Sequence, residues 1–322
     1  MSQHFLTDIE IKQFKCFTDF TASGFKRVNL IGGKNNIGKT AFMEACYVNV
    51  HGMTINNLIT AIVVIKARRE KPNLINKETG INILSTAFLD ATRIYISSSN
   101  LNKIEYSIIE QDANKEYVFK IQDTLKKINT NSINIKIKNS KNIEYIDSFG
   151  LDNAKLNRNF GIVQKKDKEE ELNKIINNFD SDIEKFKIIG DKPLCKVKNE
   201  YRDITEFGDG LKHYISIICA LYSCENGYLF IDEIDNGIHY TQLDRLWEII
   251  LKTSAKTNCQ VFATTHSKEM LESFARVSKQ LNEQDISYTL LVKNKQQEIK
   301  TISFDYEMLL DSLKQEHEVR GW

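Results

Sequence analysis

The stretch LIGGKNNIGKT, residues 30–40, has the residue types and the spacing needed to bind a phosphate chain. Gly33 is followed by four residues and then by Gly38-Lys39-Thr40, which is the G-x-x-x-x-G-K-[ST] spacing of a phosphate-binding loop. Glycines let backbone N–H groups close around a phosphate because no Cβ blocks the approach. We expect Lys39 to bridge the β- and γ-phosphates and Thr40 to bind Mg²⁺. The predicted nucleotide-contacting residues are Gly33, Lys34, Asn35, Asn36, Ile37, Gly38, Lys39, Thr40 and Ala41.

This loop alone does not identify a class of protein, because kinases, GTPase switches, helicases and transport motors share it. A plain glycine-rich turn can also match the spacing. Two carboxylates far downstream narrow the choice. The apolar run 228–231 predicts a buried strand that ends in Asp232-Glu233. In a nucleotide site, the first carboxylate holds Mg²⁺, usually through a water molecule, and the second can polarise the attacking water.

Asp232 is therefore a predicted metal ligand and Glu233 the predicted catalytic base, although acidic residues are also common at ordinary strand ends. A glutamate directly after this aspartate favours a hydrolytic ATPase over a kinase or GTPase switch. The predicted cofactors are thus ATP and Mg²⁺, with Lys39 and Glu233 in catalytic roles.

Two further stretches carry candidate site residues. Gly208-Asp209-Gly210 precedes an apolar helix, where it is an anion-binding device or simply a turn with an N-cap. His266 follows the apolar run 259–264, in the position of a γ-phosphate sensor. A lone histidine after a strand is more often structural than functional, so His266 is the least specific of the predicted catalytic residues.

The elements that must position these residues alternate between strands and helices. Runs 9–17 and 27–32 read as strands, and 40–50 and 58–67 as helices. After residue 200 we expect a helix from about 210, strands at 228–232 and 259–264, and helices at 241–252 and from 267. This alternation predicts an α/β fold with a mostly parallel sheet. Between these parts, RIYIS, KIEYSI, YVFKI and INIKIK predict an antiparallel meander, and residues 165–187 a short charged helix.

We therefore expect a single domain over residues 1–322, with a discontinuous core at about 1–80 and 180–322. An inserted β-rich and helical subdomain would occupy about 81–180. Formal net charge is +1, so no global field draws the chain to nucleic acid or to an acidic membrane. The longest apolar windows fall well short of the roughly 20 residues that a membrane span needs. The six scattered cysteines suggest buried thiols of a reducing cytosol, so the predicted location is cytoplasmic, with no membrane partner.

Two clusters of basic residues leave nucleic-acid binding open. Five lysines and no acidic residue lie between Asp123 and Glu144, and a second cluster follows the helix predicted at 58–67. These residues are Lys126, Lys127, Lys136, Lys138 and Lys141, then Arg68, Arg69 and Lys71. Either cluster could neutralise phosphates, but a solvated sheet face is the favoured interpretation.

Taken together, the order of these motifs resembles that of ABC-type ATPase heads. Phosphate loop, glycine signature, Asp-Glu strand, the loop IDNGIH and then ATTHS follow one another as in those proteins. The chain resembles in particular the OLD-like (AAA15/AAA21-type) ATPases, relatives of the RecF and SMC heads. The stretches QFKCFTDF and EHEVRGW also resemble that group. The resemblance covers residues 5–65 and 180–320, and implies an ABC-type head with flanking helices and an inserted antiparallel meander.

The resemblance implies a head-to-head dimer with two ATP molecules sandwiched at the interface. One subunit would contribute Lys39, Thr40, Asp232, Glu233 and His266. The other would contribute residues 208–210 and the Asp235-Asn236-Gly237 loop. The implied partner is a separate effector, such as a TOPRIM-type nuclease in a bacterial anti-phage or DNA-maintenance system, because the stretch after residue 280 lacks the acidic D-x-D cluster of that nuclease domain.

The chain also departs from the family pattern. Gly208 stands where the common signature has a serine, and no glutamine clearly follows a strand as the Mg²⁺-associated residue, Gln164 being a weak candidate. Slow turnover would follow from Gly208. A nucleotide-gated scaffold or sensor with little hydrolysis is therefore the main alternative. An ATPase subunit of a transporter is a third possibility, disfavoured by the meander and the QFKCF opening.

Overall fold

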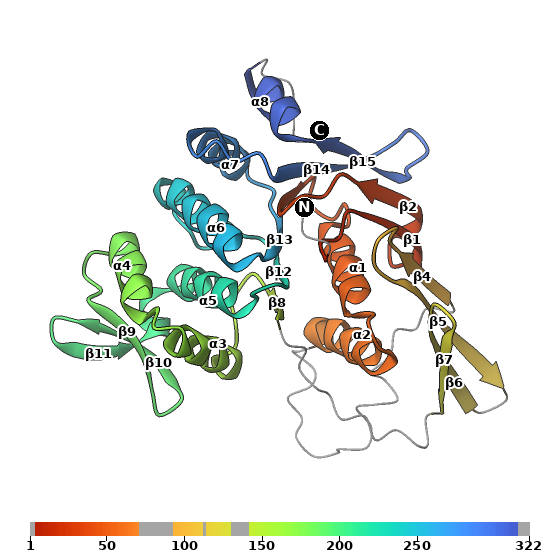
Figure 1. Cartoon of the computed structure of the whole chain (residues 1–322), viewed down its shortest axis with the longest axis horizontal. Coiled ribbons are helices and arrows are strands. Elements are labelled where there is room, and N and C mark those ends of the chain that lie inside the picture. Colours follow the sequence, from red (N-terminus) through yellow and green to blue (C-terminus); the bar gives the residue numbers. More distant parts are fainter. Residues whose placement is uncertain (1–3, 71–92, 112–113, 130–141, 315–322) are drawn as a thin grey trace.

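A computed structural model describes residues 4–70, 93–111, 114–129 and 142–314, and within them three sheets with helices around them (Figure 1). The core sheet has the order β15-β14-β3-β13-β12-β8. Its strands are β3 (Val28–Gly32), β8 (Ile143–Ile146), β12 (Tyr228–Ile231), β13 (Gln260–Thr264), β14 (Ile286–Lys293) and β15 (Ile299–Phe304). All neighbours in this sheet are parallel except β14 and β15. The α/β fold with a mostly parallel sheet is confirmed.

Both faces of the core sheet are buried, which explains its continuous apolar strands. Successive side chains of a strand point to opposite faces. In β12, Leu229 and Ile231 therefore join one hydrophobic cluster, whereas Tyr228 and Phe230 join another. The first cluster is covered by α5 (Asp209–Ser223), α6 (Leu243–Thr257) and α7 (Lys268–Gln280), and the second by α1 (Lys39–His51) and α2 (Ile55–Glu70).

A second sheet covers α1 and α2 on their other side (Figure 1). Its order is β2-β1-β4-β5-β6-β7, and all neighbouring strands are antiparallel. The strands are β1 (Asp8–Phe14), β2 (Phe17–Ser23), β4 (Arg93–Ser97), β5 (Lys103–Gln111), β6 (Asn114–Ile121) and β7 (Thr124–Asn129). The strand predicted at 9–17 is present over residues 9–14 but ends earlier than predicted, because the chain turns at Lys15-Cys16 and returns as β2.

The predicted meander is present in part, and it is not set apart from the rest. RIYIS, KIEYSI and YVFKI lie in β4, β5 and β6, which continue the sheet begun by β1 and β2. INIKIK lies outside the described residues. The end of the segment 81–180 differs more, since β8 pairs with β12 in the core sheet. The boundary that we drew at about residue 180 thus falls after a core strand.

The charged stretch 165–187 is divided among several elements. α3 (Asn153–Lys165) ends where the predicted helix begins, and α4 (Glu169–Phe179) and β9 (Lys185–Ile189) follow. β9 forms a small sheet with β10 (Lys192–Val197) and β11 (Glu200–Asp203), after which η2 (Ile204–Phe207) leads to α5. A last helix, α8 (Tyr306–Lys314), follows β15. Among the described residues, no helix is both long enough and apolar enough to span a bilayer.

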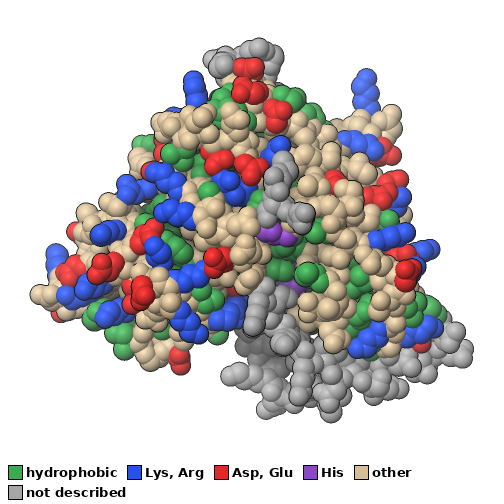
Figure 2. All heavy atoms as spheres, viewed as in Figure 1, with side chains coloured by type: hydrophobic (Ala, Val, Ile, Leu, Met, Phe, Trp, Pro, Cys, Tyr) green, Lys and Arg blue, Asp and Glu red, His purple; other side chains and the backbone are tan. Residues whose placement is uncertain are grey.

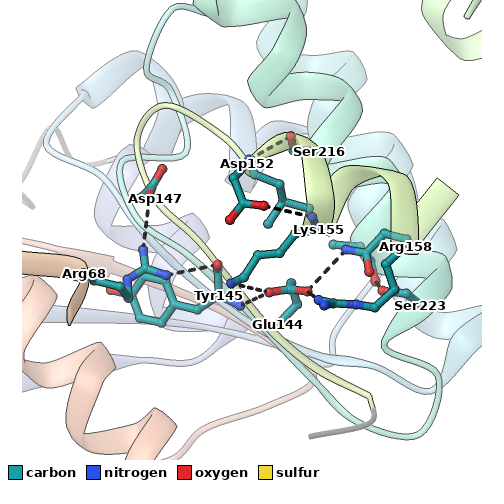
Figure 3. A network of polar contacts seen from close by, with 12 residues as sticks. Arg68, Glu144, Tyr145, Asp147, Asp152, Lys155, Arg158, Ser216 and Ser223 are labelled. Atoms are coloured by element: carbon teal, nitrogen blue, oxygen red, sulfur yellow. Dashed lines mark hydrogen bonds and ion pairs between the residues drawn. The ribbon is translucent and has the colours of Figure 1, made fainter. Parts of the chain in front are cut away.

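Figure 3 shows how the short strand β8 is held on its α3 side. Glu144 of β8 is buried and accepts hydrogen bonds from Lys155 Nζ at 3.0 Å and from Arg158 Nη2 at 2.8 Å. Both cations come from α3. A buried carboxylate without such partners would be costly, so the two cations of α3 compensate for the burial of Glu144 on β8.

On the other side, Arg68 of α2 reaches the end of β8. Its guanidinium lies 3.7 Å from the centre of the Tyr145 ring and donates to the Tyr145 carbonyl oxygen at 3.1 Å. It also lies 3.6 Å from the Asp147 carboxylate (Figure 3). Arg68 is therefore a structural contact between two layers, and its side chain is not displayed for nucleic acid.

Candidate nucleotide site

The phosphate loop connects β3 to α1, as its sequence predicts. Three residues have positive φ: Gly33 at 139°, Asn36 at 61° and Gly38 at 108°. Such angles are strained for most side chains, which explains the two glycines. Gly38 is the N-cap residue of α1, so the loop ends at the positive pole of a helix dipole. This geometry suits a bound anion.

Lys39 lies across this loop. Its Nζ donates to the carbonyl oxygens of Gly33 at 2.9 Å and of Lys34 at 3.0 Å. The pKa of Lys39 lies below its ordinary value because the side chain is partly buried, although the nearby Asp232 and Glu233 act in the opposite direction. The cation thus bridges the ends of the loop, facing the two carboxylates at the end of β12.

Asp232 meets residues from two other elements at the carboxyl edge of the sheet. Its Oδ1 lies 3.3 Å from Thr40 Oγ1 on α1 and accepts a hydrogen bond from Thr264 Oγ1 of β13 at 2.7 Å. Mg²⁺ prefers oxygen ligands at about 2.1 Å in an octahedron, which separates neighbouring ligands by about 3 Å. The Thr40 and Asp232 oxygens fit that requirement.

Glu233 has an unusual backbone. Its φ is 50°, and its N–H donates to Thr264 Oγ1 at 2.9 Å. Left-handed conformations of non-glycine residues are uncommon and often occur at functional sites. This conformation turns the chain after Asp232, and both neighbouring carboxylates line the same pocket.

These residues line a common pocket of about 560 Å³. Of the predicted residues it includes Asn35, Asn36, Gly38, Lys39, Thr40, Ala41, Asp232, Glu233 and His266. Three more, Gly33, Lys34 and Ile37, belong to the loop but do not line the pocket. Thr264 completes the wall from β13.

Sequence reasoning missed three residues of the pocket, namely Thr264, Lys15 and Cys16. Lys15 and Cys16 form the turn between β1 and β2, and this turn packs on the phosphate loop. A Cβ added to Gly38 would lie 2.7 Å from Cys16 Sγ. The sequence places QFKCF in a single predicted strand and in the family resemblance; the positive φ of Lys15, which marks a turn, is not readable from residue types.

Residues 208–210 lie outside this pocket. Gly208, with φ 81°, is the N-cap residue of α5. Gly210 packs against the 235–237 loop so closely that a Cβ on it would lie 1.9 Å from the Gly237 carbonyl oxygen. The glycine signature and this loop therefore form one surface within the chain, and neither of them lines the pocket.

Gln164 is not at the nucleotide pocket, so that weak candidate is wrong. It lies on α3, and its Nε2 donates to Glu169 at 3.0 Å. On the side of β12 away from β13, the neighbouring strand is β8, and the residue after β8 is Asp147. Because β8 consists of only four residues, its pattern did not identify it as a strand.

The basic residues that we considered for nucleic acid are partly engaged elsewhere. Lys127 pairs with Glu116 at 2.9 Å, and Lys126 Nζ donates to Asn56 at 3.2 Å. Arg68 packs on Tyr145, as described above. The side chain of Arg69 and residues 71, 136, 138 and 141 lie outside the described part. On the face seen in Figure 2, cationic and acidic side chains are interspersed.

Comparison with known proteins gives the family. Residues 28–272 match the family model described as "AAA domain, putative AbiEii toxin, Type IV TA system". The match spans the phosphate loop, the Asp232-Glu233 strand and His266. The chain belongs to this AAA domain family. It is a P-loop ATPase with the fold of an ABC-type ATPase head.

One relative in sequence and two solved structures are similar to this chain. A protein of Helicobacter pylori named ATP/GTP phosphatase is 28% identical over 330 residues, covering 85% of this chain and 89% of that protein. Two SMC head structures have the same fold. One, bound to the C-terminal winged-helix domain of ScpA, has a TM-score of 0.55 at 13% identity and covers 94% of this chain and 99% of that chain. Another, with an extended coiled coil and the C-terminal domain of Pyrococcus furiosus ScpA, has a TM-score of 0.55 at 10% identity, with coverages of 97% and 99%.

Proposed function

We propose that this ATPase hydrolyses ATP with Mg²⁺ in the pocket between the phosphate loop and the end of β12, and that two copies close around the nucleotide. One observation carries the proposal. Thr40 and Asp232 place two oxygen ligands 3.3 Å apart, with Glu233 adjacent and Lys39 on the same pocket wall. A P-loop site for a metal nucleotide needs this set.

In the proposed reaction each residue has a distinct task. Backbone N–H groups of the loop hold the phosphates, and Lys39 neutralises charge on the β- and γ-phosphates. Thr40 and Asp232 would hold Mg²⁺, which supplies charge neutralisation for the triphosphate when bound. Glu233 orients the attacking water and accepts its proton. His266, which is exposed on the pocket wall, contacts the γ-phosphate.

The dimer is supported by the separation between the pocket and the glycine signature. Residues 208–210 carry backbone N–H groups at the start of α5, where an anion is favoured. They do not line the pocket of their own chain. We therefore propose that residues 208–210, together with residues 235–237, contact the nucleotide that is bound in the pocket of a second copy. The absence of a serine at 208 leaves this contact to the backbone.

The proposed setting is bacterial anti-phage defence or DNA maintenance, with a separate effector such as a nuclease. The family description, which refers to a type IV toxin–antitoxin system, supports the first of these. The H. pylori relative is named for action on both ATP and GTP, so we propose that this chain accepts either nucleotide.

Sedimentation velocity tests the proposed cycle. With ATP and Mg²⁺, the variant Glu233→Gln should shift to a dimer and remain there, because it binds nucleotide but hydrolyses it slowly. Wild type should return to its nucleotide-free size as phosphate is released. A size that ignores nucleotide in both proteins, with no phosphate released, would remove the mechanism and leave the scaffold alternative.

Gly210→Ala should separate dimerisation from nucleotide binding. The added methyl group would collide with the Gly237 carbonyl oxygen, so the 235–237 loop must move away from α5. We expect ATP-dependent dimer formation by this variant to fall at least tenfold, with ATP affinity in the monomer unchanged. The control is Gly161→Ala on α3, where a Cβ meets nothing within 4 Å. Equal dimer formation by wild type and Gly210→Ala would contradict the role of this surface.

A further inference from the structure

The turn between β1 and β2 brings a second lysine into the nucleotide pocket. Lys15 and Cys16 line the pocket from the wall formed by the antiparallel sheet. The turn cannot move freely, since Cys16 packs against Gly38 and Phe17 lies next to it in the core. Lys15 is therefore held at a fixed position beside the first turn of α1.

Lys15 forms an ion pair with Glu44. The residue as a whole is exposed, but its side chain is only 16% exposed, and that of Glu44 is 3% exposed. Glu44 follows Thr40 by four residues and Ala41 by three, so the three side chains share one face of α1. A buried carboxylate is costly without a partner. Glu44 thus keeps a cation beside the helix start that receives the phosphates.

The two lysines of the pocket lie on different walls. Lys39 bonds to the loop carbonyls of residues 33 and 34 and faces Asp232. This is the end of the pocket that receives the γ-phosphate and the metal. Lys15 lies on the hairpin side, paired with a residue one helical turn beyond Ala41. The α-phosphate is the remaining anionic group of the nucleotide that lacks a charged partner.

We propose that Lys15 is a second phosphate-contacting residue, which holds the α-phosphate, and that Glu44 positions its ammonium group before the nucleotide arrives. The proposal rests on the proposed function, since it assigns a residue to the same pocket. Because ATP, ADP and GTP all carry an α-phosphate, Lys15 would strengthen their binding alike. It would contribute equally to the ground state and the transition state, and so affect KM and not kcat.

Calorimetric titration with ADP and with the slowly hydrolysed ATPγS tests this. Lys15→Gln alone leaves Glu44 buried without its cation and is expected to lower the melting temperature. The double variant Lys15→Gln/Glu44→Gln removes both charges and should restore the melting temperature. Its Kd should rise by roughly ten- to a hundredfold, by the same factor for both nucleotides. Steady-state kcat should stay within about twofold of wild type, with ATP and with GTP.

Two further variants separate a nucleotide contact from a structural ion pair. Lys15→Arg keeps the charge and should bind ADP nearly as wild type does. Glu44→Gln leaves Lys15 charged but removes the carboxylate that positions it, so its Kd for ADP should lie between those of wild type and the double variant. If Glu44→Gln is weakened as much as the double variant, the pair is only structural and the proposal is overturned.

Three other results also overturn the proposal. In the first, the double variant binds both nucleotides like wild type. In the second, affinity is lost only for ATPγS, which would indicate a contact with the γ-phosphate. In the third, affinity is lost only for GTP, which would indicate a contact with the base. Wild type and Lys39→Ala distinguish these failures from that of the proposed function. If wild type binds neither nucleotide, the proposed function falls together with this inference. If wild type binds nucleotide and Lys39→Ala does not, the proposed function stands. A Lys15 substitution that leaves nucleotide affinity unchanged then overturns only this inference.

Discussion

Replacing Lys39 by alanine is expected to weaken ATP binding by a factor on the order of a hundred or more. The Lys39 side chain supplies a partly buried ammonium group. It reaches from the end of the phosphate loop to the carbonyl oxygens of residues 33 and 34 at the start of the loop. Without it, the pocket still presents Asp232 and Glu233, whose charges would face the triphosphate. The variant thus loses the attraction between the ammonium group and the phosphates, whereas the repulsion between the two carboxylates and the phosphates remains. Calorimetric titration with ATPγS measures the loss directly.

Lys34→Ala is the matched control for this variant. Lys34 belongs to the same loop and carries the same charge, but it is exposed and does not line the pocket. Its affinity for ATPγS should stay within about threefold of wild type, as expected for a screened surface charge. Equal effects of the two substitutions would show that the loop acts only through general positive charge.

Glu233→Gln is expected to lower the rate of phosphate release by roughly 10²–10⁴ while the affinity for ATP is retained. Glutamine has nearly the same shape as glutamate, so the turn at φ 50° and the bond from the backbone N–H to Thr264 should persist. What is lost is the carboxylate that accepts a proton from water. Single-turnover phosphate release, with enzyme in excess over ATP, isolates this step from product release.

Glu225→Gln, in the turn between α5 and β12, is the control for that measurement. Glu225 pairs with Lys166 at the surface and lies outside the pocket, so its rate should match that of wild type. A normal rate in Glu233→Gln would exclude Glu233 as the base. A wild type that keeps ATP intact through the same assay would instead favour the nucleotide-gated sensor.

The parts of the pocket that sequence could predict are those whose local pattern is dictated by chemistry. The spacing from Gly33 to Thr40 is set by the phosphate chain, and an acidic pair after four apolar residues stands out in a buried strand. Both motifs lie where the patterns placed them, between β3 and α1 and after β12. Their roles in catalysis stay predictions.

The parts that sequence could not predict depend on contacts between distant segments. Lys15 enters the pocket only because the β1–β2 turn packs on Gly38, and no periodicity encodes that contact. Strand β8 consists of four residues, and its buried Glu144 finds its cations on α3, which lies outside the strand's own pattern. The same holds for the meander, whose strands join β1 across a long stretch of sequence.

The order of the core sheet has a consequence for synthesis of the chain on the ribosome. Strand β3, which carries the phosphate loop, pairs with β13 at residues 260–264 and with β14 at residues 286–293. Both partners are translated more than two hundred residues later. At roughly 5–20 residues per second, β3 waits on the order of tens of seconds for either neighbour. During that interval an apolar strand has two unpaired edges, which favours association with other nascent chains. We therefore expect productive folding of this ATPase to be helped by protection of β3 until β13 and β14 have been synthesised.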